Sequence, residues 1–163
     1  MKQRFVMAIV LMLAAGAVPR AQTQAADEEK IRAIVGTMLP EKINALDADG
    51  AAALWSETGT HAGLVYGARV REGRAAIRQM WATGFSSPGR DAARKVSVEI
   101  AGVRFIRPDV ATVDAKNVYH GGANAAGILK PDTNELLFVV LTREKGAWMI
   151  QSSRVVPMIG QPR

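Results

Sequence analysis

The chain contains no cysteine and only two histidines among its 163 residues. Without cysteine there is no disulfide framework and no thiol for a lipid anchor, so the core must form without covalent cross-links. The histidines, His61 and His120, lack any short metal-ligand spacing, so we expect no metal site. Glycine-rich phosphate loops and the Gly-x-Ser-x-Gly motif are also missing, and we expect no cofactor.

The N-terminus has the pattern of a secretory signal peptide. Lys2 and Arg4 precede an apolar stretch over residues 5–18 and a short polar segment over residues 19–25. Thr23 and Ala25 fit the small-residue cleavage rule, so we expect cleavage after Ala25 and a periplasmic or secreted protein. The alternative is a membrane anchor, but the apolar stretch is shorter than the about 20 residues that span a bilayer. We therefore expect no stable membrane anchor, and a single domain over residues 26–163.

The net charge argues against a nucleic-acid partner. Loss of residues 1–25 removes three basic residues and no acidic one, which lowers the formal charge from +6 to +3. Two basic clusters remain, and neither contains the interleaved aromatic residues that stack on bases. We interpret both as solvated faces: Arg69, Arg71, Arg74 and Arg78 form one, and Arg90, Arg94 and Lys95 the other.

The first half of the chain predicts helices. Residues 27–45 have helical apolar spacing, with a kink or break expected at Pro40 because proline cannot donate to the carbonyl of Gly36. A second short helix is expected from an N-cap at Asp49 to about residue 56. Short strands over residues 60–65 and 69–71 precede a third helix over residues 73–85, with Trp81 on its inward face.

The second half predicts a sheet. Residues 96–120 form two long strands joined at Arg107-Pro108-Asp109, and the apolar alternation slips at Gly102, as in a β-bulge. Two more strands are expected over residues 136–143 and 148–158. After the first turn one strand face carries Ala111, Val113, Ala115, Asn117 and Tyr119. The order of elements predicts an α+β domain with helices on one face of a curved sheet.

Four segments carry a resemblance to a known superfamily. They are Asp49-Gly50-Ala51, Val-Arg-Glu-Gly-Arg-Ala-Ala-Ile over residues 70–77, the hairpin over residues 103–111, and Gly-Ala-Trp-Met-Ile over residues 146–150. Together they resemble the SnoaL-like proteins of the nuclear-transport-factor-2-like superfamily, closest to the SgcJ/EcaC group. The resemblance implies a cone-shaped curved antiparallel sheet packed on about three N-terminal helices, with a pocket at the wide end. Many members dimerise through the open sheet face.

The chain departs from the enzymes of this superfamily at two places. Where members of the ketosteroid isomerase kind carry an aspartate base, this chain has Leu64. Where relatives carry a polar pair after the Trp-x-Ile segment, it has Arg154 and Val155.

Three polar residues are candidates for binding a ligand. Strand alternation places Arg154 on the face of Trp148 and Ile150, where its guanidinium can anchor a carboxylate, form a salt bridge or lie at the rim. Asn117 and Tyr119 either orient a ligand by hydrogen bonds or are polar strand ends that emerge into water. A one-residue slip in strand phase would replace them by Asp114 and His120.

The remaining candidates are aromatic. Trp55, Trp81 and Tyr66 form either the wall of a pocket or part of the core. His61 is either a general base near the pocket mouth or an exposed residue beside Thr60.

We favour an exported domain whose aromatic-lined pocket binds a small apolar or amphipathic ligand, including one that bears a carboxylate. The alternative is a cofactor-free lyase, isomerase or cyclase that uses His61, Asn117 or Tyr119 for proton transfer. A third hypothesis, compatible with the first, is a homodimer through the sheet face that carries Val110, Thr112 and Val118.

Overall fold

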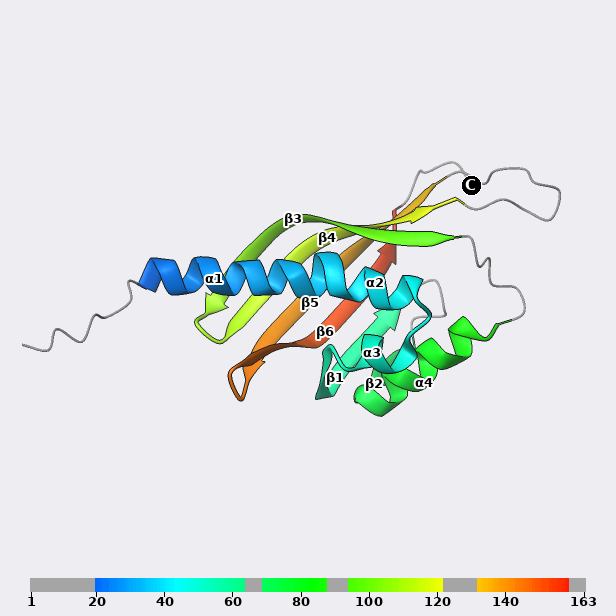
Figure 1. The fold of residues 1–163 in the computed structure, drawn as a ribbon, viewed down its shortest axis with the longest axis horizontal. Helices are drawn as coiled ribbons and strands as arrows, with labels where there is room; N and C mark the ends of the chain where they lie inside the picture. The colour runs from blue at the N-terminus through cyan, green and yellow to red at the C-terminus, as the bar shows by residue number, and fades with distance from the viewer. Residues whose placement is uncertain (1–19, 64–68, 88–93, 122–131, 159–163) are drawn as a thin grey trace, which may run out of the picture.

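A computed structural model describes residues 20–63, 69–87, 94–121 and 132–158. It contains one six-stranded sheet in the order β2-β1-β6-β5-β4-β3, with helices on one face (Figure 1). Strand β1 runs parallel to β6 and the other neighbours are antiparallel, so the sheet is mixed where an antiparallel sheet was predicted. The strands are β1 (Trp55–Gly63), β2 (Val70–Glu72), β3 (Lys95–Arg107), β4 (Val110–His120), β5 (Thr133–Glu144) and β6 (Ala147–Pro157).

The N-terminal helical segment lies across the sheet as one rod (Figure 1). It consists of α1 (Arg20–Arg32), the π-helical η1 (Ala33–Met38) and α2 (Leu39–Asn44). The irregularity expected at Pro40 takes the form of this π-helix, and Pro40 itself lies at the start of α2, where a missing N–H is tolerated. A Cβ on Gly36 would lie 3.1 Å from Ile100 Cδ1, so glycine allows η1 to pack closely on β3.

Two short helices cover the other end of the sheet: α3 (Ala48–Ala52) and α4 (Arg74–Phe85). The predicted cap at Asp49 is wrong, because Asp47 caps α3 by accepting a 2.7 Å hydrogen bond from the Gly50 amide. The chain enters β1 already at Trp55, so this residue is on a strand and not at a helix end. Gly73, with φ of 82°, precedes α4 and allows the sharp change of direction from β2.

The core lies between the helical rod and one face of the sheet. Ile31, Val35 and Leu39 from the rod are buried against the alternate strand residues Ala111, Val113 and Ala115 of β4. The predicted phase of β4 is therefore correct, and Asp114 and His120 lie on the face away from the helices. None of the described helices is both long enough and apolar enough to cross a membrane.

Among the described strands the register shifts at four places, and two of these shifts affect the faces on which the candidate residues lie. The first is the predicted one: Ile100 pairs with Ala115 and Gly102 with Asp114, which leaves Ala101 as the extra residue. The second was not predicted: Leu141 pairs with Ile150 and Val140 with Ser152, so Gln151 is extra in β6. Because strand side chains alternate between faces, this insertion exchanges the faces of all β6 residues after Gln151.

A buried ion pair fixes the start of the helical rod to the β5–β6 hairpin. Asp27 is 7% exposed and pairs with Arg143, whose guanidinium carbon lies 4.9 Å from the centre of the Trp148 ring. The pair explains how an acidic residue remains buried, since its charge is neutralised locally. Cleavage after Ala25 would retain Asp27 in the mature chain.

Candidate functional site

His61 is a buried polar residue on the helix-facing side of β1. It is 7% exposed, and its Nδ1 lies 2.7 Å from the Oγ of Ser153 on β6. The parallel pairing of β1 with β6 places the two residues opposite each other. The bulge at Gln151 is what turns Ser153 toward the helices. No described residue forms a hydrogen bond with Nε2 of His61, so this nitrogen is available to a ligand.

Two tryptophans surround the His61 ring. The Trp55 ring lies edge-on at a centroid distance of 6.0 Å, and the Trp81 ring is tilted at 5.8 Å. Phe85 stacks on Trp81 at 5.5 Å, one helical turn further along α4. The indole N–H groups of Trp55 and Trp81, like that of Trp148, are buried and have no acceptor among the described residues. Buried donors are almost always paired in proteins, so these two mark a place where an acceptor would be stabilised.

Burial, followed by the positive charges of Arg154 and Arg71, lowers the pKa of His61 from 6.5 to about 4. The ring is therefore neutral at physiological pH. A general base works best when its pKa lies near the working pH, so a base with a pKa of about 4 is poorly matched to proton abstraction at pH 7. A neutral imidazole among aromatic rings is better suited to orienting a ligand by a hydrogen bond.

Arg71 is the cation that shares the face of His61. The β1–β2 register pairs these two residues directly, and opposed residues of an antiparallel pair point to the same side. Arg71 is half-buried and has no acidic partner among the described residues. The other members of its predicted basic cluster differ: Arg74 pairs with Glu57 and Arg78 with Asp49, while Arg69 is exposed.

The predicted position of Arg154 is wrong. It was expected on the face of Trp148 and Ile150, but the extra residue Gln151 turns it to the face away from the helices. There one guanidinium nitrogen, Nη1, donates to Thr60 Oγ1 at 3.2 Å and to the Ser153 carbonyl at 2.8 Å. The sequence gives no clear signal for this bulge, because Val155 and Val156 are both apolar and either could continue the buried face. Ile150 and Val155 are both buried, and their odd separation requires one inserted residue between them.

Asn117 and Tyr119 lie on the predicted face of β4 but away from His61. Asn117 is 7% exposed. In the sheet register it pairs with Glu135 of β5. The row of His61 runs through Ser153 and Val139 to Val113 of β4. Asn117 is four residues further along β4 and three strands away, so it does not meet His61 in the sheet. The guanidinium carbon of Arg94 lies 4.5 Å from the centre of the Tyr119 ring.

Of the predicted site residues, the structure thus brings together His61, Trp55 and Trp81. Tyr66, and Leu64 at the position of the missing base, lie outside the described residues. Arg71 and Ser153 are the members of the site that the sequence did not identify. Both depend on which residues pair across strands that are far apart in the chain.

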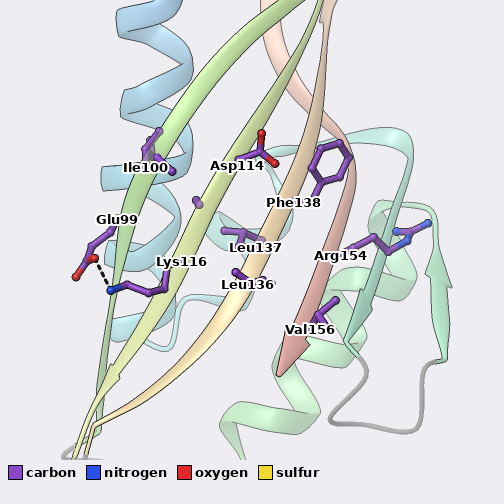
Figure 2. A pocket seen from close by; sticks show the side chains of 11 residues that line it. Glu99, Ile100, Asp114, Lys116, Leu136, Leu137, Phe138, Arg154 and Val156 are labelled. Carbon is purple, nitrogen blue, oxygen red and sulfur yellow. Dashed lines mark ion pairs between the residues drawn. The ribbon is translucent and has the colours of Figure 1, made fainter. Parts of the chain in front are cut away.

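The opposite face of the sheet carries a hollow of about 550 Å³ (Figure 2). Leu136, Phe138 and Val156 give it an apolar surface, and they are 51%, 40% and 37% exposed. Both signs of charge line the same hollow: Glu99, Asp114 and Lys116 come from β3 and β4, and Arg154 comes from β6 on the other side. Lys116 Nζ lies 2.7 Å from Glu99 Oε2, as the dashed line in Figure 2 shows. Thr112 and Val118, predicted to be open on this face, are buried within the chain itself.

The curved sheet covered on one side by helices is a cone-shaped α+β domain. His61 lies buried among aromatic rings inside it. No family model and no curated protein matches the chain. Solved structures match its fold. A domain of unknown function with a cystatin-like fold from Nostoc punctiforme has a TM-score of 0.70 at 20% identity, covering 82% of this chain and 78% of that one.

Two further solved structures have descriptions that name a protein group. An NTF2-like protein with a cystatin-like fold from Novosphingobium aromaticivorans has a TM-score of 0.66 at 18% identity, over 86% of this chain and 88% of that one. A ketosteroid isomerase-like protein from Erwinia carotovora atroseptica gives 0.66 at 18%, over 82% and 96%. The chain therefore has the cystatin-like fold of the NTF2-like proteins. The narrower SgcJ/EcaC resemblance stays a prediction.

Proposed function

We propose that the protein binds a small, largely apolar molecule with a carboxylate group against His61, Trp55 and Trp81. The observation that supports this most is the neutral, buried His61, whose Nε2 has no hydrogen-bond partner among the described residues and whose ring contacts Trp55 and Trp81. Arg71 supplies the charge opposite the carboxylate, in the role first expected of Arg154. A planar guanidinium can hold a carboxylate through two hydrogen bonds.

The lowered pKa of His61 favours binding over the alternative of a lyase, isomerase or cyclase. The separation of Asn117 and Tyr119 from His61 points the same way, because neither of these two alternative proton-transfer groups lies beside the buried imidazole. Binding without chemistry is therefore the function that the residues around His61 support best.

Calorimetric titration at pH 7 with 2-naphthoate and 2-naphthamide tests this proposal. The two probes share one aromatic body and differ in charge. We expect naphthoate to bind at least about tenfold more tightly, which corresponds to about 1.4 kcal/mol. R71A should abolish the preference, and the matched variant R69A should retain it, because Arg69 is exposed and lies outside the His61 pair. Equal binding of both probes, or binding of neither, would contradict the proposal.

We also propose that the protein is exported and loses residues 1–25. The charged start, apolar stretch and small residues before Ala26 support this. Expression with the native N-terminus in a Gram-negative host should yield periplasmic protein whose intact mass lacks these residues. Full-length protein retained in the cytoplasm would contradict it.

The hollow on the outer sheet face supports a homodimer. A two-fold interface needs a self-complementary surface, and this one has an apolar centre with both signs of charge around it. In light scattering, the wild type should have twice the monomer mass and F138E the monomer mass. I106E is the matched control, because Ile106 is also exposed but lies outside the hollow. A monomeric wild type would rule out the dimer.

A further inference from the structure

The second histidine of the chain lies in a hydrogen-bonded row of three residues on the outer face of the sheet. Ser97 Oγ is 2.9 Å from His120 Nε2, and His120 Nδ1 is 3.2 Å from Asp132 Oδ2. The order of atoms is serine oxygen, one ring nitrogen, the other ring nitrogen, carboxylate. In a neutral ring with the proton on Nδ1, Nε2 is free to accept the serine proton.

The fold brings these residues together from three strands. Ser97 is near the start of β3, His120 ends β4, and Asp132 directly precedes β5. Lys95 pairs with His120 and Ser97 pairs with Val118, which makes Ser97 and His120 diagonal neighbours on one face. None of the three lines the hollow described above, so a partner seated there does not need to cover them.

Asp132 is held in place by a second contact. Its Oδ1 accepts a 2.8 Å hydrogen bond from the Gly121 amide, while Oδ2 faces His120. The Gly121 amide, with a smaller contribution from His120, lowers the pKa of this carboxyl. The carboxylate therefore stays ionised and fixes the orientation of the imidazole ring.

Charged residues of both signs lie near Ser97 on this face, because Lys116 is ion-paired with Glu99 at 2.7 Å and Asp132 faces His120. Lys95 lies opposite His120, and Lys116 is on the same face two residues before Val118, the partner of Ser97. Long side chains at diagonal positions of an antiparallel pair are within reach of each other.

We propose that Ser97, His120 and Asp132 form a surface site for nucleophilic acyl transfer from activated carboxylic esters, such as aryl esters. Ser97 Oγ forms a bond to the ester carbonyl carbon while its proton moves to His120 Nε2. The ester C–O bond then breaks, and the leaving phenolate takes that proton. Water then forms a bond to the acyl carbon while His120 Nε2 takes its proton. The bond between the acyl carbon and Ser97 Oγ breaks, Ser97 Oγ recovers the proton from His120, and the free acid leaves. Asp132 is a positioning residue that acts through His120.

This site is independent of the ligand proposed at His61. It lies on the other face of the sheet and shares no residue with it. Failure of the naphthoate titration leaves the acyl-transfer proposal intact, and the reverse also holds.

The test is covalent labelling of the full-length protein with a fluorophosphonate, followed by peptide mass spectrometry, together with hydrolysis of p-nitrophenyl acetate. We expect the label on Ser97 and acetate-ester hydrolysis about 10²-fold faster than in S97A, the lower range for a positioned base. H120Q should reduce both signals to the level of S97A. D132N should shift the pH profile of labelling, and D132E should partly restore it.

Ser152 supplies the matched control. It lies on the same face, and its Oγ bonds to Thr60 at 3.2 Å with no histidine in contact. S152A should leave labelling and hydrolysis unchanged. Circular dichroism would establish that each variant is folded. Equal labelling of Ser97 and Ser152, or hydrolysis that persists in folded S97A, would overturn the proposal.

Discussion

His61 and His120 each bond to a serine on a neighbouring strand, but they lie on opposite faces of the sheet. His61 is 7% exposed and lies between aromatic rings, whereas the His120 side chain is 49% exposed and faces a carboxylate. The same pair of residue types therefore has two environments. The buried pair provides a neutral hydrogen-bonding group for a ligand, and the exposed pair provides an oriented base beside a nucleophile.

The largest difference between the two faces should appear when aromatic residues are truncated. Trp55 is 1% exposed, so W55A should lower the free energy of unfolding by about 3–5 kcal/mol through the cavity it creates. Phe138, on the outer face, is 40% exposed, and F138A should cost about 1 kcal/mol or less. Urea unfolding at low micromolar concentration measures both. Equal losses would show that the faces do not differ in burial.

The free energy of unfolding should fall at acid pH because of the buried histidine. The folded chain holds the pKa of His61 at about 4, below the 6.5 of the unfolded chain. The unfolded state therefore binds the proton more readily, and stability that is complete above pH 6.5 is lost as the pH falls toward 4. The loss should be about 3 kcal/mol for this group.

The comparison is with H61Q, because other groups also titrate in this range. H61Q should be less stable than the wild type at pH 7 but should have a flatter dependence on pH between 6.5 and 4. Parallel pH profiles of the two proteins would show that His61 is not held neutral by burial.

A smaller effect is expected at the two serines. S153A removes the partner of a buried imidazole nitrogen and should cost about 1–3 kcal/mol. S97A removes a hydroxyl next to an exposed ring and should change stability by no more than about 0.5 kcal/mol. Thermal unfolding at pH 7 compares them. If S97A lost more stability than S153A, the assignment of Ser153 to a structural role and Ser97 to a nucleophilic role would be wrong.

Much of the fold was predictable because it depends on local patterns. The 3.6-residue spacing of Ile31, Val35 and Leu39 and the alternation of Ala111, Val113 and Ala115 each identify the buried face of one element. Gly102 marked the first bulge. The position of Asp47 as the helix cap was missed because Asp49 offers the same chemistry two residues later.

The site was predictable only in part. Trp81 could be assigned to the inward face of α4, but His61 could equally be exposed, since β1 is short of apolar alternation. Arg154 was assigned to the wrong face because an alternation was continued through Gln151. Val155 and Val156 are both apolar, and only the structure shows that Val155 is the one on the buried face.

The sequence by itself determined the elements, the two faces of β4 and the α+β class, because hydrophobic periodicity acts within one segment. Only the tertiary structure decided that Ser153 and Arg71 share a face with His61, and that Ser97, His120 and Asp132 meet. These contacts depend on how the strands pair and on the extra residue Gln151 in β6. A one-residue shift moves a side chain to the other face of a sheet, so pairing between distant segments decides which chemistry each face carries.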